Sequence, residues 1–270
     1  MFINNNWLID NLLNSKGFMV CRMGNVETTA LTQKEGIYSQ MFTNAGFYGD
    51  EEVFKQWRNQ YIKALYDMDC FLDVVSCPSF VICGDFLTKM NIWKPTLAYI
   101  ERIDFWLDLL EIIKKFKKSV CIVSYFANEM ATQYKNIKKI FPHKDLSGIN
   151  IRFVESYNTI KGNEIHKDYN ETFLKLKSKL DNLTNDIYLV SCGCYGLPLC
   201  NYIKSKGKNS IYVGGLLQMM FGLKGNRWDN RPHMNKYYNK HWKYPQKKPK
   251  NLEQVEGGCY WGKHRDEVTS

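Results

Sequence analysis

The chain has 270 residues, of which 44% are hydrophobic and 14% aromatic, and its formal net charge is +10. This length and composition can bury a sizeable core, so we expect one compact α/β unit. The longest nearly uncharged apolar stretch, residues 213–223, is too short for a membrane-spanning helix of ~20 residues. The N-terminus has no basic start followed by an apolar block, so no signal peptide and a cytoplasmic location are expected.

The cysteine pattern argues against a disulfide scaffold and against a zinc site. There are nine cysteines, most of them inside apolar runs, and none is arranged as Cys-x-x-Cys. An odd number of buried-looking thiols is typical of a reduced protein in which cysteine packs as a small apolar residue. We therefore expect reduced, packed thiols.

Apolar spacing alternates between helical and strand-like patterns along the chain. In order, the predicted elements are a helix at 7–16, a strand at 18–23, helices at 26–40 and 51–69, a strand at 71–76, a helix at 97–116, a strand at 119–124, a helix at 127–140, a strand at 149–154, a helix at 169–182, a strand at 187–192, a helix at 196–206 and a strand at 210–213. This alternation predicts a doubly wound, mostly parallel, Rossmann-like sheet. Ligands of such sheets bind beyond the carboxyl ends of the strands.

The alternation stops near residue 224, where the sequence becomes basic and aromatic. Residues 224–250 hold nine Lys or Arg against one Asp, or +8 of the net charge. We interpret 224–261, the C-terminal flap, as an ordered loop over the site, and a disordered strip is the alternative. Its charge suits a polyanion, a diphosphate or an anionic membrane, or only a solvated lysine-rich face. Residues 1–261 are then a single domain, and 262–270 a loose tail.

The first candidate site follows the first strand and contains Arg22, Gly24, Asn25 and Glu27. Glycine lets the backbone turn close to a ligand, and the Arg22 guanidinium can fork onto phosphate oxygens. Asn25 and Glu27 could present oxygen atoms to a hard divalent cation. Alternatively, Asn25 caps the next helix and Glu27 only interacts with its dipole.

The second candidate site is the turn that holds Ser191, Cys192, Gly193 and Gly196, between a strand and a helix. Small residues at such a junction expose backbone N–H groups and a helix N-terminus to an anion. The turn is neither a Walker motif nor a GxGxxG fingerprint, so a close-packed turn without a ligand is the alternative.

The third candidate site follows the last strand. Gly215 permits close backbone approach, and Gln218 offers an amide. Arg227 could bind phosphate, and Trp228 could supply a stacking face. Core packing is the alternative for the apolar residues between them.

Two carboxylates are candidates for a general base. Glu129 follows the strand at 119–124, and Asp85 follows the apolar run that contains Gly84. Either could accept the proton of an attacking hydroxyl, although a surface carboxylate is the ordinary interpretation of both.

Together these turns resemble GT-D type glycosyltransferases, in which an early Arg-x-Gly-Asp-x-Glu motif holds a metal. The matching run is 22–27, with Asn25 where the family has Asp. Residues 44–48 and 255–261 look like a virus-encoded and bacterial subgroup, which would imply the host cytoplasm for a viral protein. The resemblance implies a hexosyl- or pentosyltransferase with Mn²⁺ or Mg²⁺ at Asn25 and Glu27, a UDP- or GDP-linked sugar donor, and a glycan or glycoprotein acceptor.

Two other functions remain open from the sequence. The doubly wound pattern allows a dinucleotide-dependent oxidoreductase, but the GxGxxG fingerprint and a ribose-binding acid are missing. The basic flap allows a nucleic-acid-binding module, although nucleic acid is not the partner we expect. Cofactor titration and salt-sensitive oligonucleotide binding would separate these functions from glycosyl transfer.

Overall fold

The fold is built on one sheet of seven parallel strands. The computed structural model describes residues 4–32, 40–74, 79–99, 103–255 and 257–262. The strand order is β3-β2-β1-β7-β6-β4-β5, and every pairing is parallel. The predicted doubly wound, parallel α/β architecture is therefore confirmed. The strands are β1 (Met19–Cys21), β2 (Cys70–Val74), β3 (Thr96–Tyr99), β4 (Val120–Ser124), β5 (Ile151–Glu155), β6 (Ile187–Ser191) and β7 (Asn209–Tyr212).

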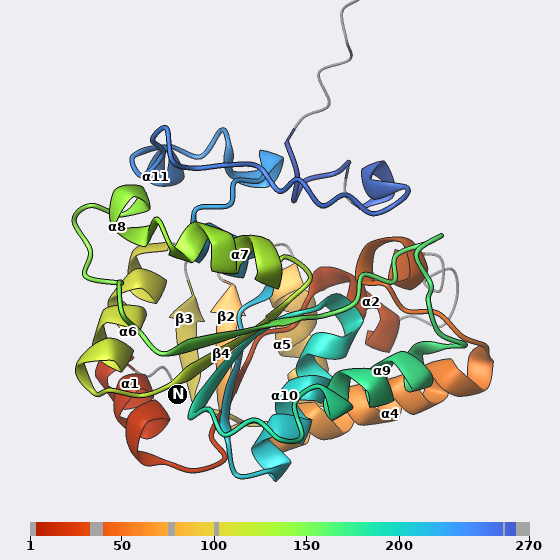
Figure 1. Ribbon diagram of the computed structural model, residues 1–270. Helices are drawn as coiled ribbons and strands as arrows, with labels where there is room; N and C mark the ends of the chain where they lie inside the picture. Colours follow the sequence, from red (N-terminus) through yellow and green to blue (C-terminus); the bar gives the residue numbers. More distant parts are fainter. Residues whose placement is uncertain (1–3, 33–39, 75–78, 100–102, 256, 263–270) are drawn as a thin grey trace, which may run out of the picture.

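Helices cover both faces of the sheet, as Figure 1 shows. Alternate side chains of one strand enter different cores: Ile211 belongs to the core cluster that contains Leu216 and Trp106, whereas Tyr212 belongs to the cluster of the opposite face, which contains Cys21. Such alternation is what a strand buried on both sides requires. The helices are α1 (Asn5–Asn14), α2 (Asn25–Thr32), α4 (Glu51–Asp67), α5 (Ser79–Lys89), α6 (Ile103–Lys115), α7 (Ala127–Tyr134), α8 (Ile137–Ile140), α9 (Tyr169–Ser178), α10 (Gly196–Ser205) and α11 (Pro232–Asn235).

The chain leaves the two central strands toward opposite faces. After β1 it enters α2, whose Ala30 and Leu31 pack in the core that contains Cys21. After β7 it enters the 3₁₀ segment η3 (Gly214–Phe221), whose Leu216 belongs to the other core. Neighbouring parallel strands whose connections diverge leave a crevice at their carboxyl ends, which is where such sheets bind ligands.

Most predicted elements are present, and the largest error lies at one edge of the sheet. Residues 97–116 were expected to be one helix, but 96–99 form the edge strand β3, paired with β2, and α6 begins at Ile103. Residues 100–102 lie outside the described chain. A short apolar run such as Leu97–Ala98 fits both the helical and the strand periodicity, so pairing with neighbouring strands decides its conformation. The helix α5 was not predicted at all.

Two predicted helices differ clearly in extent from those in the structure, and a third is described only in part. The helix predicted at 26–40 matches α2 as far as Thr32, and residues 33–39 lie outside the described residues. The helix predicted at 127–140 is two helices, α7 and α8, separated near Asn136. The helix predicted at 169–182 ends at Ser178.

The described residues of the C-terminal flap form short helical segments and turns, and they lie beyond α7 and α8 in Figure 1. Most of the predicted tail, 263–270, lies outside the described residues. Across the described chain, no helix combines the length and apolarity needed to cross a bilayer. The eight described cysteines are all buried and form no disulfide with one another.

Candidate functional site

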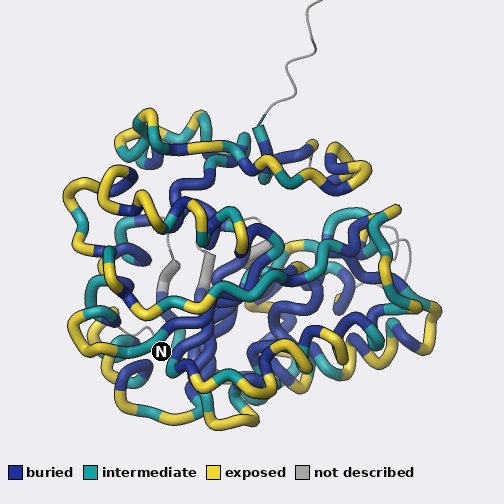
Figure 2. The backbone as a smooth tube through the Cα atoms, viewed as in Figure 1, coloured by how far each residue is buried: buried dark blue, intermediate teal, exposed yellow. Residues whose placement is uncertain are grey.

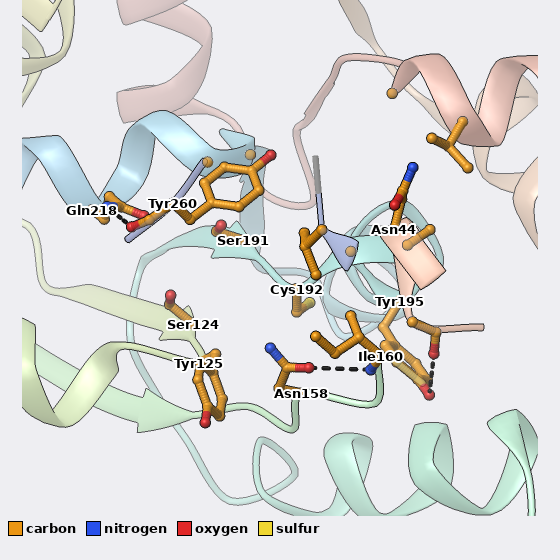
Figure 3. Close-up of a pocket in the computed structure, with 18 of the residues that line it drawn as sticks. Asn44, Ser124, Tyr125, Asn158, Ile160, Ser191, Cys192, Tyr195, Gln218 and Tyr260 are labelled. Atoms are coloured by element: carbon orange, nitrogen blue, oxygen red, sulfur yellow. Dashed lines mark hydrogen bonds between the residues drawn. The ribbon is translucent and has the colours of Figure 1, made fainter. Parts of the chain in front are cut away.

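A cavity of about 390 Å³ lies at the carboxyl ends of the central strands. Its lining comes from the segments after β1, β4, β5, β6 and β7, from the π-helical turn η1 (Met41–Ala45), and from the flap. Figure 3 shows Asn44, Asn158 and Tyr260, which are far apart in sequence, around this common space. The cavity therefore occupies the crevice that the β1–β7 divergence creates.

The turn after β1 contributes Arg22, Gly24, Asn25 and Glu27 to the lining, so the first predicted site does border a cavity. The helix α2 begins at Asn25, and the Gly24 carbonyl accepts the Thr28 N–H at 2.9 Å. Gly24, rather than Asn25, therefore precedes the helix. The Glu27 side chain is buried and folds back on Gly24, where a Cβ atom would overlap its carboxylate. Glycine is needed there to leave room for that carboxylate.

Arg22 connects the turn after β1 to the turn after β7. Gly214 has a φ of +73°, and a Cβ atom there would lie 2.5 Å from Arg22 Nη1. The guanidinium thus lies against the backbone of the β7 turn and borders the cavity. A Cβ atom on the adjacent Gly215 would overlap the ring of Tyr260. The absence of side chains at these two glycines therefore lets Arg22 and, from the flap, Tyr260 lie directly against the turn after β7.

The turn after β6 contributes Ser191, Cys192 and Gly193 to the same cavity. Gly193 has a φ of +54°, and a Cβ atom on it would overlap the Ala45 carbonyl oxygen of η1. Burial, followed by the nearby thiol of Cys200, raises the pKa of the Cys192 thiol, so this wall stays uncharged at neutral pH. The first and second predicted sites therefore meet in one cavity.

Gly196 supports this turn from outside the cavity. It is the first residue of α10, and a Cβ atom there would overlap the Tyr212 ring. The Tyr212 hydroxyl donates to the Gly193 carbonyl at 3.2 Å. Gly196 is thus a packing residue that lets Tyr212 brace the turn, and it is not among the cavity-lining residues.

The flap supplies the remaining wall through Arg227, Arg231, Val255, Tyr260 and Trp261. The Arg227 guanidinium donates to the Tyr260 hydroxyl at 3.4 Å through Nη1. The Arg227 backbone N–H donates to a carbonyl near the flap's end, 2.9 Å away. The two ends of the flap are therefore joined beside the cavity.

Gln218 lines the cavity, but its amide nitrogen also ties the flap to η3. Nε2 donates to the Lys224 carbonyl at 2.8 Å and to the Tyr260 carbonyl at 3.0 Å. The side chain is almost fully buried. Its main effect in this structure is to position Tyr260 (Figure 3).

Several lining residues were not anticipated from the sequence. Tyr125 follows β4, and Asn158 and Thr159 follow β5. Asn158 Oδ1 accepts the Ile160 N–H at 3.1 Å, and Thr159 shares a 3.0 Å hydrogen bond with the Tyr195 hydroxyl. Their position directly after predicted strands was the available signal, because parallel strands gather these segments at one edge.

The formal charge of the cavity is positive. Its described lining contains three arginines, Arg22, Arg227 and Arg231, against one carboxylate, Glu27. Burial, followed by Glu155 and Glu129, raises the pKa of Tyr125 to about 12, so its phenol is neutral. Guanidinium groups beside glycine backbone favour an anion with several oxygens, such as a diphosphate.

The residues at α2 fit a divalent cation only in partnership with a ligand. Glu27, which carries a carboxylate, and Asn25, which carries an amide, both belong to the lining. Among the described residues, no group of three His, Cys, Asp or Glu side chains forms a metal site. One carboxylate with diphosphate oxygens and waters is a usual environment for Mg²⁺.

Three other predicted site residues lie outside the cavity lining. Asp85 is exposed on α5, and Trp228 is buried against Gly225 and Tyr260. Glu129 accepts backbone N–H groups of the flap instead of facing the cavity. Their placement gives no support for the predicted catalytic or stacking roles.

Comparison with known proteins adds only distant similarity. No family model and no curated protein matches the chain. Among solved structures, it is similar to a glycosyltransferase (DUF1792) from Streptococcus sanguinis, with 15% identity, 92% of this chain and 95% of that chain covered, and a TM-score of 0.47. It is also similar to a selenomethionine-substituted domain of unknown function (DUF1792), with 14% identity, 88% and 97% covered, and a TM-score of 0.43. Function is therefore inferred from the cavity itself.

Proposed function

We propose that this chain is a glycosyltransferase that moves a sugar from a nucleoside-diphosphate sugar to a hydroxyl group of a glycan or glycoprotein. The observation that carries the proposal is the meeting of the turns after β1, β6 and β7 in one cavity lined by three arginines. The Arg22 guanidinium lies against Gly214 and so joins the turns after β1 and β7, which supports a shared anion site at these two turns. UDP and GDP are the donor nucleotides we expect.

The arginines fit the chemistry of the departing diphosphate. Negative charge grows on the diphosphate as its bond to the sugar breaks, and fixed donors at that position stabilise the transition state. Arg22, from the turn after β1, and Arg227, from the flap, would supply those donors. Asn25 and Glu27 would hold Mn²⁺ or Mg²⁺ against the diphosphate oxygens, where the cation supplies further charge stabilisation.

The acceptor hydroxyl has no assigned base within the lining. Among the described lining residues the carboxylate is that of Glu27, and we assign it as a ligand of the cation. Neither sequence candidate faces the cavity, because Glu129 accepts backbone N–H groups of the flap and Asp85 is exposed on α5.

Ligand binding tests the proposed function directly. Thermal shifts with UDP, GDP, UDP-glucose and GDP-mannose, each with and without Mn²⁺, should show stabilisation by at least one nucleotide. A ligand at 100 times its dissociation constant stabilises by ~2.7 kcal/mol. Arg22→Ala should remove this shift, and Arg22→Lys should keep part of it because the charge remains but the fork is lost.

The matched control is Arg152→Ala, because Arg152 is an exposed arginine on β5 that does not line the cavity. It should retain the wild-type shift. Stabilisation by NADH or NADPH alone would favour the oxidoreductase, and salt-sensitive binding of an oligonucleotide without any nucleotide shift would favour a nucleic-acid-binding module. Either result would replace the glycosyltransferase proposal.

A further inference from the structure

Two side chains on one face of α7 hold the backbone of the C-terminal flap. Glu129 accepts the Gln246 N–H at 2.8 Å through Oε2 and the Lys247 N–H at 3.0 Å through Oε1. One helical turn later, Gln133 Nε2 donates to the carbonyls of Gly222 and His241, at 3.1 and 3.0 Å. Residues four apart lie on the same helix face, so Glu129 and Gln133 form a single clamp.

The segment that Glu129 holds lies next to residues that line the cavity. The Lys247 ammonium pairs with Glu155 at 2.5 Å and lies 4.2 Å from the centre of the Tyr125 ring. The Lys247 carbonyl accepts the indole N–H of Trp261 at 2.9 Å. Tyr125 and Trp261 both border the cavity. Displacement of the 246–247 backbone would therefore disturb the cavity wall.

The flap adds no strand to the described sheet, so it is held by buried side chains, such as Trp228 and Trp242, and by these polar contacts. One isolated bridge, outside the named strands of the described chain, pairs Lys243 of the flap with Leu223, which precedes it. Its other backbone hydrogen bonds are mostly turns, such as Tyr238 to Asn235. A carboxylate that accepts two N–H groups provides strong, charge-assisted anchoring in such a segment.

We propose that Glu129 is a positioning residue: it fixes the flap so that Arg227, Tyr260 and Trp261 complete the anion-binding cavity. This role is different from that of a general base, because Glu129 acts through the flap and does not touch the ligand. Its effect on ligand binding depends on the proposed diphosphate site. The clamp itself does not, and it can be measured without any ligand.

The first experiment measures the clamp alone, by hydrogen exchange of the Gln246 and Lys247 amides in the free protein. Glu129→Gln keeps the size of the side chain but turns an NH₂ group toward an N–H donor, so these amides should exchange about tenfold faster. Asp10→Asn is the control, because Asp10 is an exposed carboxylate on α1. Unchanged exchange in Glu129→Gln would overturn the clamp.

The second experiment measures the dissociation constant of inorganic pyrophosphate. Glu129→Gln should bind it about five- to tenfold more weakly, with an unchanged urea midpoint for global unfolding. A double-mutant cycle with Arg227→Ala separates positioning from general destabilisation. If Glu129 acts through Arg227, the losses of pyrophosphate binding energy in the two single variants are not additive in the double variant.

The outcomes distinguish the two proposals. Faster exchange with unchanged pyrophosphate affinity, or fully additive losses in the cycle, would overturn the positioning role. If the wild-type protein did not bind pyrophosphate, the diphosphate site and with it the positioning role would fail, while the exchange data would still decide whether the clamp exists. Faster exchange, weaker binding and non-additivity together support the inference.

Discussion

The two halves of the cavity wall are held in different ways. The turns after β1, β6 and β7 continue from strands that are almost entirely buried, whereas the flap alternates between buried and exposed residues (Figure 2). Met19, Leu189 and Ile211 in these strands have no exposed surface. The flap is held by side-chain contacts such as those of Glu129 and Gln218. One half is thus fixed by buried strands, and the other by buried side chains such as Trp242 together with polar side-chain contacts.

This difference predicts a difference in local stability. Opening the sheet half requires exposing core residues, so its amides should exchange only with global unfolding. The flap can detach without breaking strand pairs, by exposing a few buried side chains such as Trp242 and losing a limited set of hydrogen bonds. Each of these hydrogen bonds is worth about 0.5–1.5 kcal/mol, or about 1.5–3 kcal/mol where a charge is involved. A ligand that contacts both halves should therefore protect the flap more strongly than the sheet.

The largest effect is expected from Gly214→Ala, which tests the sheet half. The new Cβ atom would lie 2.5 Å from Arg22 Nη1, and the residue would keep a φ of +73°. Displacing the guanidinium should weaken pyrophosphate binding ~10- to 100-fold, the loss of a charge-assisted contact. Isothermal titration calorimetry would measure it.

Gly207→Ala is the matched control for that substitution. Gly207 has a φ of +70°, and no atom lies within 4 Å of its missing Cβ, so the variant carries the backbone strain without a contact. It should lose stability but bind pyrophosphate normally. Equal loss of binding in both variants would mean that strain, rather than Arg22, controls the site.

The adjacent Gly215→Ala tests the flap half and should have a smaller effect. Its Cβ atom would overlap the Tyr260 ring, which belongs to the flap. Because the flap adds no strand to the described sheet, it can yield more easily than the β7 turn, and we expect pyrophosphate affinity to fall only ~3- to 10-fold, with faster exchange of flap amides. Gly84→Ala, where no atom lies within 4 Å, is the control. A larger loss than in Gly214→Ala would reverse the comparison between the halves.

The same contrast explains what could be predicted from the sequence. The strands and the turns at Arg22 and Ser191 were found because apolar periodicity and glycine carry local signals. In the sequence the flap was visible only as a change in composition. Its conformation depends on contacts between residues far apart in the chain, such as the hydrogen bond from Gln133 to the His241 carbonyl, over 100 residues away. Glu129 was assigned a possible base role because sequence position cannot tell which way a helical carboxylate faces. The edge strand β3 was missed since its conformation is set by pairing with β2.

Glu27→Gln should change pyrophosphate affinity moderately, and the direction of the change should depend on whether Mn²⁺ is present. Glu27 is the carboxylate in a lining with three arginines. Without a cation, removing its charge should leave pyrophosphate binding unchanged or up to about fivefold tighter, because repulsion is lost. With Mn²⁺, the variant should lose any enhancement that the wild type shows. Titrations with and without Mn²⁺ would measure both, and an unchanged enhancement by Mn²⁺ would remove the metal role from Glu27.

The smallest expected effect is on the pH dependence of the unfolding free energy, and it arises from Asp186 in the sheet half of the molecule. Although burial opposes the shift, hydrogen bonds from the Ser119 N–H and hydroxyl, each 2.7 Å, lower the pKa of Asp186 from 3.8. The ionised group is thus favoured in the folded state, so its stabilisation is present above pH 3.8 and is lost as pH falls through the lowered pKa.

Asp186→Asn should therefore cost about 1 kcal/mol of unfolding free energy at pH 6, and less at pH 3. Urea unfolding at the two pH values would measure the difference, with the exposed Asp10→Asn as the control. Pyrophosphate affinity at pH 6 should not change, because Asp186 lies at the amino end of β6 and the cavity lies at the carboxyl end. A loss of affinity would show that the base of the sheet also controls the site, and the contrast would then no longer be between two independent halves.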